Sequence, residues 1–413
     1  MMKKLGFVLA CVAAALPVAP EARAAADAAD AADHVVQVGA VQPDGAPYSY
    51  TRFYPKTVEV HRGDTVEFRM PTGPNTADTQ FHTVTFSPAS DDPQPGWFRP
   101  DEAPGTFAFN EAVLAGTGCG RGDEPACVLS GEEGEFFSSG SPADANWAHS
   151  DGTMRPFRVK VDAPEGEYSF RCLIHDGMTG TVQVVDDDAA VANPSAADIE
   201  AEVAEDTAAA DALVARESEQ APPTIENGRR VWTVKTGART ADAHVDVLSY
   251  FPGTAQIAAG DEVRFVAVEP HTVTFPAAAV GPKLGPTPIP WGTGGGAFLP
   301  ACDMDGPATG APGVLLMPVA TPCPDGSTFE LMMPPWMTSG QPAVADTVAT
   351  PATIHNSGLI LPAHAPEFQR GLPKGSGRHF PAEFRAVFPA SGTFAYGCSL
   401  HAAIGMRGGV TVR

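Results

Sequence analysis

The chain is short of positive charge and, after its first residues, of long apolar runs. Its 413 residues contain 26 Lys and Arg against 49 Asp and Glu, which gives a formal net charge of −23. Nucleic acids are bound through their phosphates by basic surfaces, so a chain this acidic is not expected to take nucleic acid as a partner. Beyond the N-terminal region, no stretch is long and apolar enough to span a membrane as a helix. The sequence therefore predicts no membrane span there.

The N-terminal segment has the features of an export signal. Lys3 and Lys4 precede an apolar stretch, and Ala22-Arg23-Ala24 forms a small-residue cleavage site. The apolar stretch is too short to cross a bilayer comfortably. We expect residues 1–24 to be a signal peptide that is cleaved near Ala24, and the mature protein to be secreted or periplasmic.

Cysteine is also scarce, with 7 in the chain. Cys11 lies in the expected signal, and Cys172 and Cys398 belong to motifs considered next. The four others form one close pair in each half of the chain: Cys119 with Cys127, and Cys302 with Cys323. Because an exported protein can keep disulfides, we expect a bridge within each pair. Bridges between the halves or an additional metal site are the alternatives.

Two segments far apart in the chain carry the same order of sulfur and nitrogen side chains. In each, a Cys follows a strand-like run, a His stands three residues later, and a Met follows before a closing strand-like run. An upstream His opens the sequence His-Thr-Val-Thr-Phe in both halves. The two sets are His82, Cys172, His175 and Met178, and His271, Cys398, His401 and Met406. Thiolate, two imidazoles and a thioether are the donors of a type 1 (blue) copper site.

Both halves resemble the cupredoxins, the family of plastocyanin, azurin and amicyanin. The first loop has the Cys-x2-His-x2-Met spacing of amicyanin, and the second has the Cys-x2-His-x4-Met spacing of plastocyanin. The resemblance implies an all-β fold of two Greek-key sandwiches in tandem, with one type 1 copper in each domain held by the eight residues above. The family often has Asn after the first His, where it ties the ligand loops together. Thr83 and Thr272 stand there in this chain, and their hydroxyls can still form hydrogen bonds.

The pattern of strands divides the chain into two domains. Apolar and polar residues alternate through 53–69, and 249–265 repeats that pattern, which is typical of half-buried strands. We expect one cupredoxin domain over 34–187, an acidic linker over 188–228 and a second domain over 229–413, each domain interrupted by a long loop insertion. In the linker, Ser195 and Asp198 resemble a helix capping box. A single helix and an extended acidic tether are the two alternatives for this segment.

Several other residues are given structural roles. His34, His61 and His244 are expected at the surface. Met332, Met333 and Met337 form a cluster that either packs within the second insertion or binds Cu(I) through thioethers.

The function expected from these features is electron transfer by copper. The partner would be a redox protein, such as a cytochrome or an oxidoreductase, and the unequal loop lengths predict unequal reduction potentials. One alternative is an enzyme related to multicopper oxidases or copper nitrite reductases. Those enzymes need His-x-His pairs and a His beside the type 1 Cys, and this chain has neither. Another alternative is a protein that sequesters copper or uses the fold as structure. The sequence therefore favours a carrier over an enzyme.

Overall fold

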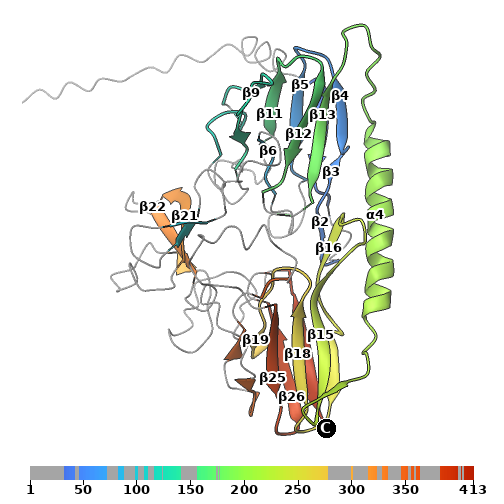
Figure 1. The fold of residues 1–413 in the computed structure, drawn as a ribbon, viewed down its shortest axis with the longest axis vertical. Coiled ribbons are helices and arrows are strands. Elements are labelled where there is room, and N and C mark those ends of the chain that lie inside the picture. The colour runs from blue at the N-terminus through green and yellow to red at the C-terminus, as the bar shows by residue number, and fades with distance from the viewer. Residues whose placement is uncertain are drawn as a thin grey trace, which may run out of the picture.

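The structure is a computed structural model of the whole chain (Figure 1). It describes residues 32–41, 46–71, 82–87, 98–100, 107–109, 116–122, 124–140, 156–173, 175, 177–277, 299–300, 315–322, 328–333, 346–351, 355–357, 360–362, 382–398, 401 and 404–413. The expected signal segment lies outside these residues. Among the helices described, none is long and apolar enough to cross a membrane.

The first sandwich consists of two five-stranded sheets. One has the order β3 (Phe53–Tyr54), β1 (His34–Val38), β5 (Thr65–Arg69), β11 (Phe157–Val161) and β9 (Cys127–Leu129). The other has the order β10 (Phe137–Ser138), β6 (Thr85–Phe86), β12 (Gly166–Arg171), β13 (Thr179–Val184) and β4 (Thr57–Val60).

The second sandwich has a larger and a smaller sheet. The larger has the order β2 (Tyr48–Tyr50), β16 (Val245–Phe251), β15 (Arg229–Arg239), β18 (Glu262–Ala267), β25 (Glu383–Val387) and β23 (Asp346–Thr347), with β14 (Thr224–Glu226) also paired to β15. The smaller has the order β17 (Thr254–Ile257), β27 (Arg407–Val412), β26 (Gly392–Gly397), β19 (Thr274–Phe275) and β24 (His355–Asn356).

The two sandwiches follow the same strand plan. In one sheet of each, β1 and β15 pair in parallel with β5 and β18. In the other sheet, β13 and β27 pair in parallel with β4 and β17, and antiparallel with the preceding strands β12 and β26. The loop that carries Cys, His and Met joins the last two strands of each half. The prediction of an all-β protein with cupredoxin-like sandwiches is therefore confirmed.

Each sandwich has its own apolar core, built from residues that alternate along the strands. In β11 the side chains at Phe157, Val159 and Val161 are buried, while those between them are not. Side chains alternate between the two faces of a strand, so this spacing directs one face inward. The Cys of each loop motif belongs to its own core, beside the buried Met of the same loop.

One aromatic ring in each core lies over a glycine of the next strand. Phe170 pairs with Gly180, and Tyr396 pairs with Gly408. A Cβ at Gly180 would come within 2.3 Å of the Phe170 ring, and a Cβ at Gly408 within 2.6 Å of the Tyr396 ring. Each glycine therefore makes room for the aromatic residue two positions before the metal-loop Cys.

The chain crosses between the sandwiches at its first hairpin. Strand β3 pairs with β1 in the first sandwich, whereas β2, only a few residues earlier, pairs antiparallel with β16 of the second. Tyr50 lies opposite Val245, and Tyr48 lies opposite Val247. The predicted first domain, 34–187, thus contributes an edge strand to the other sheet.

The predicted linker contains a helix, α4 (Ala196–Glu217), which lies alongside both sandwiches in Figure 1. Its capping box is formed by Ser195 and Asp198, as expected from the sequence. Its Ala210 and Leu213 are buried in a third apolar cluster together with Tyr48, Tyr50 and other residues of β2, β15 and β16. The helix is therefore a packed part of the junction rather than an extended tether.

Polar contacts fix the helix onto the junction. Asp206 is 3 % exposed and accepts hydrogen bonds from Tyr54 Oη at 2.7 Å and Arg52 Nη1 at 3.2 Å, while His244 Nδ1 lies 3.0 Å from its other carboxylate oxygen. Tyr50 Oη lies 2.7 Å from Thr207 Oγ1. Buried carboxylates are tolerated when paired and hydrogen-bonded, as this one is.

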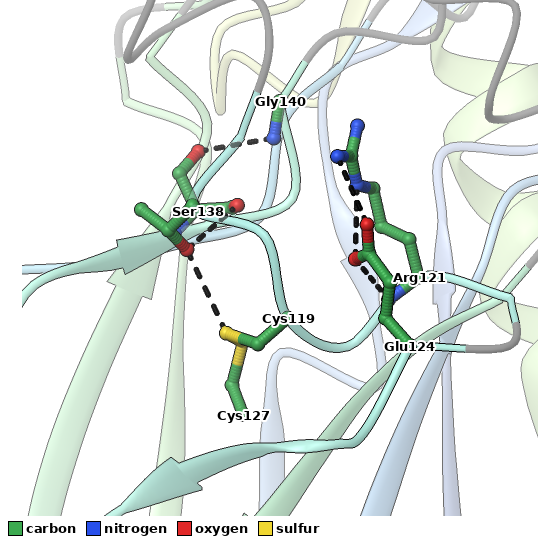
Figure 2. The surroundings of a disulfide bond; sticks show 7 residues. Cys119, Arg121, Glu124, Cys127, Ser138 and Gly140 are labelled. Atoms are coloured by element: carbon green, nitrogen blue, oxygen red, sulfur yellow. Dashed lines mark hydrogen bonds and ion pairs between the residues drawn. A yellow bond between two sulfur atoms is a disulfide. The ribbon is translucent and has the colours of Figure 1, made fainter.

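The insertion in the first half is held by the expected disulfide between Cys119 and Cys127 (Figure 2). The bridged segment contacts β10, since Thr117 Oγ1 accepts a hydrogen bond from Ser138 N at 3.1 Å. The other expected pair, Cys302 and Cys323, lies outside the described residues.

The two insertions also pair with each other. Strand β21 (Leu315–Pro322) pairs in parallel with β8 (Phe107–Phe109), and β7 (Phe98–Pro100), β20 (Leu299–Pro300) and β22 (Thr328–Met333) complete that sheet. Met332 and Met333 lie on β22, and Met337 is outside the described residues.

The histidines expected at the surface are more enclosed than predicted. His34 is 4 % exposed, and its ring nitrogens contact Asn193 and Asp64 at 2.5 and 2.8 Å, so its predicted surface position is wrong. His61 and His244 are partly buried. The polar contacts of these three histidines with Asn193, the Ala189 carbonyl and Asp206 join segments distant in sequence, which the local pattern does not reveal.

Candidate metal centres

In the first sandwich, three of the predicted ligands converge. The Nδ1 atoms of His82 and His175 are 3.0 Å apart and lie 3.9 and 3.8 Å from Cys172 Sγ. His82 comes from the segment before β6, while Cys172 and His175 come from the loop between β12 and β13. Cys172 is buried and is not in a disulfide.

The second sandwich repeats this arrangement almost atom for atom. The Nδ1 atoms of His271 and His401 are 3.0 Å apart, and each lies 3.7 Å from Cys398 Sγ. Both triads are groups whose ligand atoms are close enough to hold one metal ion. In each, the upstream His is fully buried and the loop His is partly exposed.

The two loops are closed by the same backbone bonds despite their different lengths. Cys172 N donates to Met178 O at 2.9 Å, and Cys398 N donates to Met406 O at 3.1 Å. The Met amide of each loop donates in turn to the carbonyl of its His. Met178 and Met406 are 1 % and 2 % exposed and pack in the same cores as their cysteines. The extra residues of the second loop are therefore accommodated between His401 and Met406.

The residue after each upstream His ties it to the thiol. Thr83 N and Thr272 N donate to Sγ of Cys172 and Cys398 at 3.3 and 3.4 Å. In the first site, Thr83 Oγ1 also accepts a bond from Leu173 N at 2.8 Å, so the hydroxyl joins the two ligand segments. Backbone amides aimed at sulfur stabilise the thiolate, which is the form that binds metal.

A serine in each half supports the segment that carries the upstream His. Ser139 Oγ accepts a hydrogen bond from Val84 N, and Ser357 Oγ accepts one from Val273 N, both at 2.8 Å. Residues 136–140 and 354–358, to which these serines belong, are only loosely similar in sequence. Their roles were missed at the sequence level because the segments stand in insertions of different length.

The four histidines of the two triads are held in the neutral form. Burial lowers the pKa of His82 to about 3 and that of His401 to about 4. Burial also places the pKa values of His175 and His271 well below the ordinary value for histidine. A neutral imidazole keeps a lone pair for a metal at neutral pH.

The two upstream histidines differ in what holds the far side of their rings. His82 forms a hydrogen bond with the backbone of Tyr50, and its Nδ1 faces the thiol. His271 Nε2 is buried and has no hydrogen-bond partner among the described residues. It lies instead against Gly237, where a Cβ would come within 2.6 Å of it. Packing rather than a hydrogen bond therefore orients the His271 ring.

Replacing Gly237 with Ala is expected to impair the second site alone. The added methyl group would overlap the His271 ring and displace it from the position in which its Nδ1 faces Cys398. Disturbing the support of a ligand typically lowers metal affinity by about 10–100-fold. The measurement is copper affinity by visible titration in a Cys172→Ser background, where only the second site is complete.

Gly260→Ala is the matched control for this substitution. Gly260 has φ +88° against +82° for Gly237, so both alanines adopt a similar left-handed conformation, but no atom lies within 4 Å of a Cβ at Gly260. Equal copper affinity in the two variants would contradict the proposed role of Gly237.

The donor set fits a soft or borderline transition metal. Donor atoms bonded to one ion at about 2.0–2.3 Å lie about 3–4 Å from each other, and the three edges of each triad fall in that range. One thiolate and two imidazoles suit copper better than magnesium or calcium, which prefer oxygen.

A third group of potential ligands lies at the junction. Asp206, Asp242 and His244 approach one another closely enough to hold an ion. Their contacts with each other and with Arg52 and Tyr54 already account for the buried carboxylate of Asp206. This group acts as an ion-pair network of the interface.

Comparison with known proteins gives matches among solved structures only. No family model matches the chain, and no curated protein matches it. It is similar to plastocyanin from Dryopteris crassirhizoma, with 19 % identity over 37 % of this chain and 99 % of that one and a TM-score of 0.18. A copper-containing nitrite reductase from Thermus scotoductus matches with 11 % identity over 95 % of this chain and 70 % of that one, with a TM-score of 0.20. The cupredoxin-like class is assigned from the strand plan and the position of the metal loops described above.

Proposed function

We propose that the protein is an exported copper protein that carries electrons, with one type 1 copper site in each sandwich. The ligands would be His82, Cys172, His175 and Met178 in the first site, and His271, Cys398, His401 and Met406 in the second. The observation that carries the proposal is the presence of two thiol–imidazole triads with nearly equal edges in two sandwiches of one plan. Copper in such a donor set changes between Cu(I) and Cu(II) with little rearrangement.

The surrounding residues favour this use because they fix the donors before metal arrives. The closing bonds of the loops, the amides aimed at sulfur and the serines behind the upstream histidines leave little freedom to any ligand. A preorganised site resists the rearrangement that would otherwise accompany a change of redox state. Fixed geometry therefore serves electron transfer better than reversible storage of copper.

The negative net charge supports a basic redox protein as partner. The formal charge of −23 would steer such a partner electrostatically and make the association sensitive to salt. Export agrees with the disulfide between Cys119 and Cys127, since disulfides persist in oxidising compartments.

Copper titration of the purified chain tests the proposal. We expect binding to saturate at two equivalents, with an intense visible thiolate-to-copper band that bleaches on reduction and returns on oxidation. Oxygen or nitrite consumption with an electron donor should stay at background.

Each other outcome of the titration points to a different function. Binding without colour would favour sequestration, and sustained consumption of oxygen or nitrite would favour an enzyme. Either result would contradict the proposed function as an electron carrier.

A further inference from the structure

The two metal loops lie at the facing ends of the sandwiches. The C-terminus stands at the outer end of the second sandwich (Figure 1), and because β27 ends there, the loop that precedes β27 is at the inner end. In the first sandwich, β13 leads outward to the segment that enters α4, so the loop before β13 is also at the inner end. His175 and His401, the partly exposed ligands, thus both lie toward the junction.

Backbone pairing connects the surroundings of the two upstream histidines. Tyr50, whose backbone acts on His82, lies opposite Val245 in the β2–β16 ladder. Strand β16 pairs in turn with β15, and the register of this pairing shifts at Gly237, the residue that packs against His271. Two further bonds strengthen the crossing, from Thr51 N to His244 O at 2.8 Å and from Leu248 N to Pro47 O at 2.7 Å. A continuous hydrogen-bonded sheet therefore runs from one site to the other.

From this geometry we infer that each metal site is the other's electron partner, with His175 and His401 facing each other as the route between the sandwiches. The inference rests on the proposed function and extends it, because it makes the chain a two-electron relay rather than two independent carriers. An exchange moves one electron from the reduced site to the oxidised site and makes or breaks no bond. An external donor supplies the electron and an external acceptor removes it.

The first test measures placement rather than activity. Both sites are loaded with Cu(II) and the frozen protein is studied by electron paramagnetic resonance. We expect magnetic dipolar coupling between the two ions, and its disappearance in Cys172→Ser and in Cys398→Ser, which each keep one site. Two blue sites without coupling would overturn the inference and leave the proposed function standing, whereas a colourless wild type would overturn the proposed function itself.

The second test measures the exchange. Met178→Gln is used to shift the spectrum and potential of the first site, since the axial ligand tunes both. After flash reduction by a soluble photoreductant, we expect a first-order redistribution of the electron whose rate constant does not change on dilution. A phase that slows with dilution would show exchange between molecules and would overturn the inference.

A substitution that weakens the junction between the sandwiches can be compared with a control on the same helix. Asp206→Asn removes charge from the contacts with Arg52 and His244, and should weaken the coupling and slow the redistribution several-fold while both visible bands remain. Glu205→Ala, an exposed neighbour on the same helix, should change neither. If Asp206→Asn does not fold, Thr207→Val, which removes the contact with Tyr50, takes its place. Unchanged coupling and rate in the folded variant would contradict the role of the junction.

Discussion

Cys172→Ser and Cys398→Ser are each expected to abolish one of two copper sites and to remove about half of the visible absorption. A hydroxyl at either position is a poor ligand for copper and cannot give the thiolate charge-transfer band, so no residual colour should come from the altered site. The measurement is the visible spectrum together with copper content for both single variants and the double variant, which should be colourless.

Each cysteine variant is the control for the other. The two triads lie in separate cores, so loss of one thiol should leave the second band in place. Retention of full colour in either single variant would contradict the ligand assignment of that sandwich. Loss of both bands in one single variant would show that the two sites do not form independently.

The largest expected effect on stability comes from Arg239→Met. Arg239 Nε donates to Asp246 Oδ1 at 2.7 Å and lies 3.3 Å from Glu269 Oε1. Asp246 is 3 % exposed, and removing one partner of a buried ion pair typically costs about 3–5 kcal/mol because the other charge is left uncompensated. The measurement is the free energy of unfolding of the metal-free protein in denaturant.

The double variant Arg239→Met/Asp246→Asn separates this cause from lost packing. With Asp246 made neutral, only the contact of Arg239 with Glu269 is still lost, so much of the lost stability should return. A double-mutant cycle gives the coupling between Arg239 and Asp246. A double variant no more stable than Arg239→Met alone would show that the guanidinium acts through packing instead.

The loss in Arg239→Met should also depend on pH. Burial raises the pKa of Asp246, while Arg239 acts in the opposite direction. Without Arg239 the folded-state pKa rises further above the unfolded value, so the folded state takes up the proton more readily than the unfolded chain. Relative to wild type, the deficit should therefore be largest at neutral pH and shrink as the pH falls into the ordinary carboxyl range. A deficit that grew on acidification would contradict this account.

The convergence of the Cys and His of each loop could be predicted from the sequence because these two residues are close together in it. Cys and His three residues apart on a loop between two strands must approach each other, and the common His-Thr-Val-Thr-Phe run marks the third donor in both halves. The structure brings these three together twice. The capping box at Ser195 likewise predicts the start of α4, since all its atoms lie within one helical turn.

The supports of the site could not be predicted in the same way. Gly237 and Tyr50 contact the histidines from strands distant in sequence. No local sequence pattern predicts that a glycine will pack against a histidine ring. Strand β2, Tyr48–Tyr50, was not expected from the sequence, and a run of three residues does not show which sheet it joins. Ala402, Ala403 and Ile404 follow His401 in the sequence, which suggests an apolar docking surface around that residue. Ala402 and Ala403 lie outside the described residues, and Ile404 is partly buried against the second core.

The crossing of β2 into the second sandwich has a consequence for dividing the gene. If the chain were divided within 188–228 and its two parts expressed separately, the strands of the second sandwich would be split between them. The C-terminal product would expose the edge of β16, and an uncovered strand edge invites association with other chains. The N-terminal product would carry Tyr48 and Tyr50 into solvent without their neighbours. Co-expression of both fragments should therefore yield more soluble material than either alone, since each supplies the surface that the other lacks.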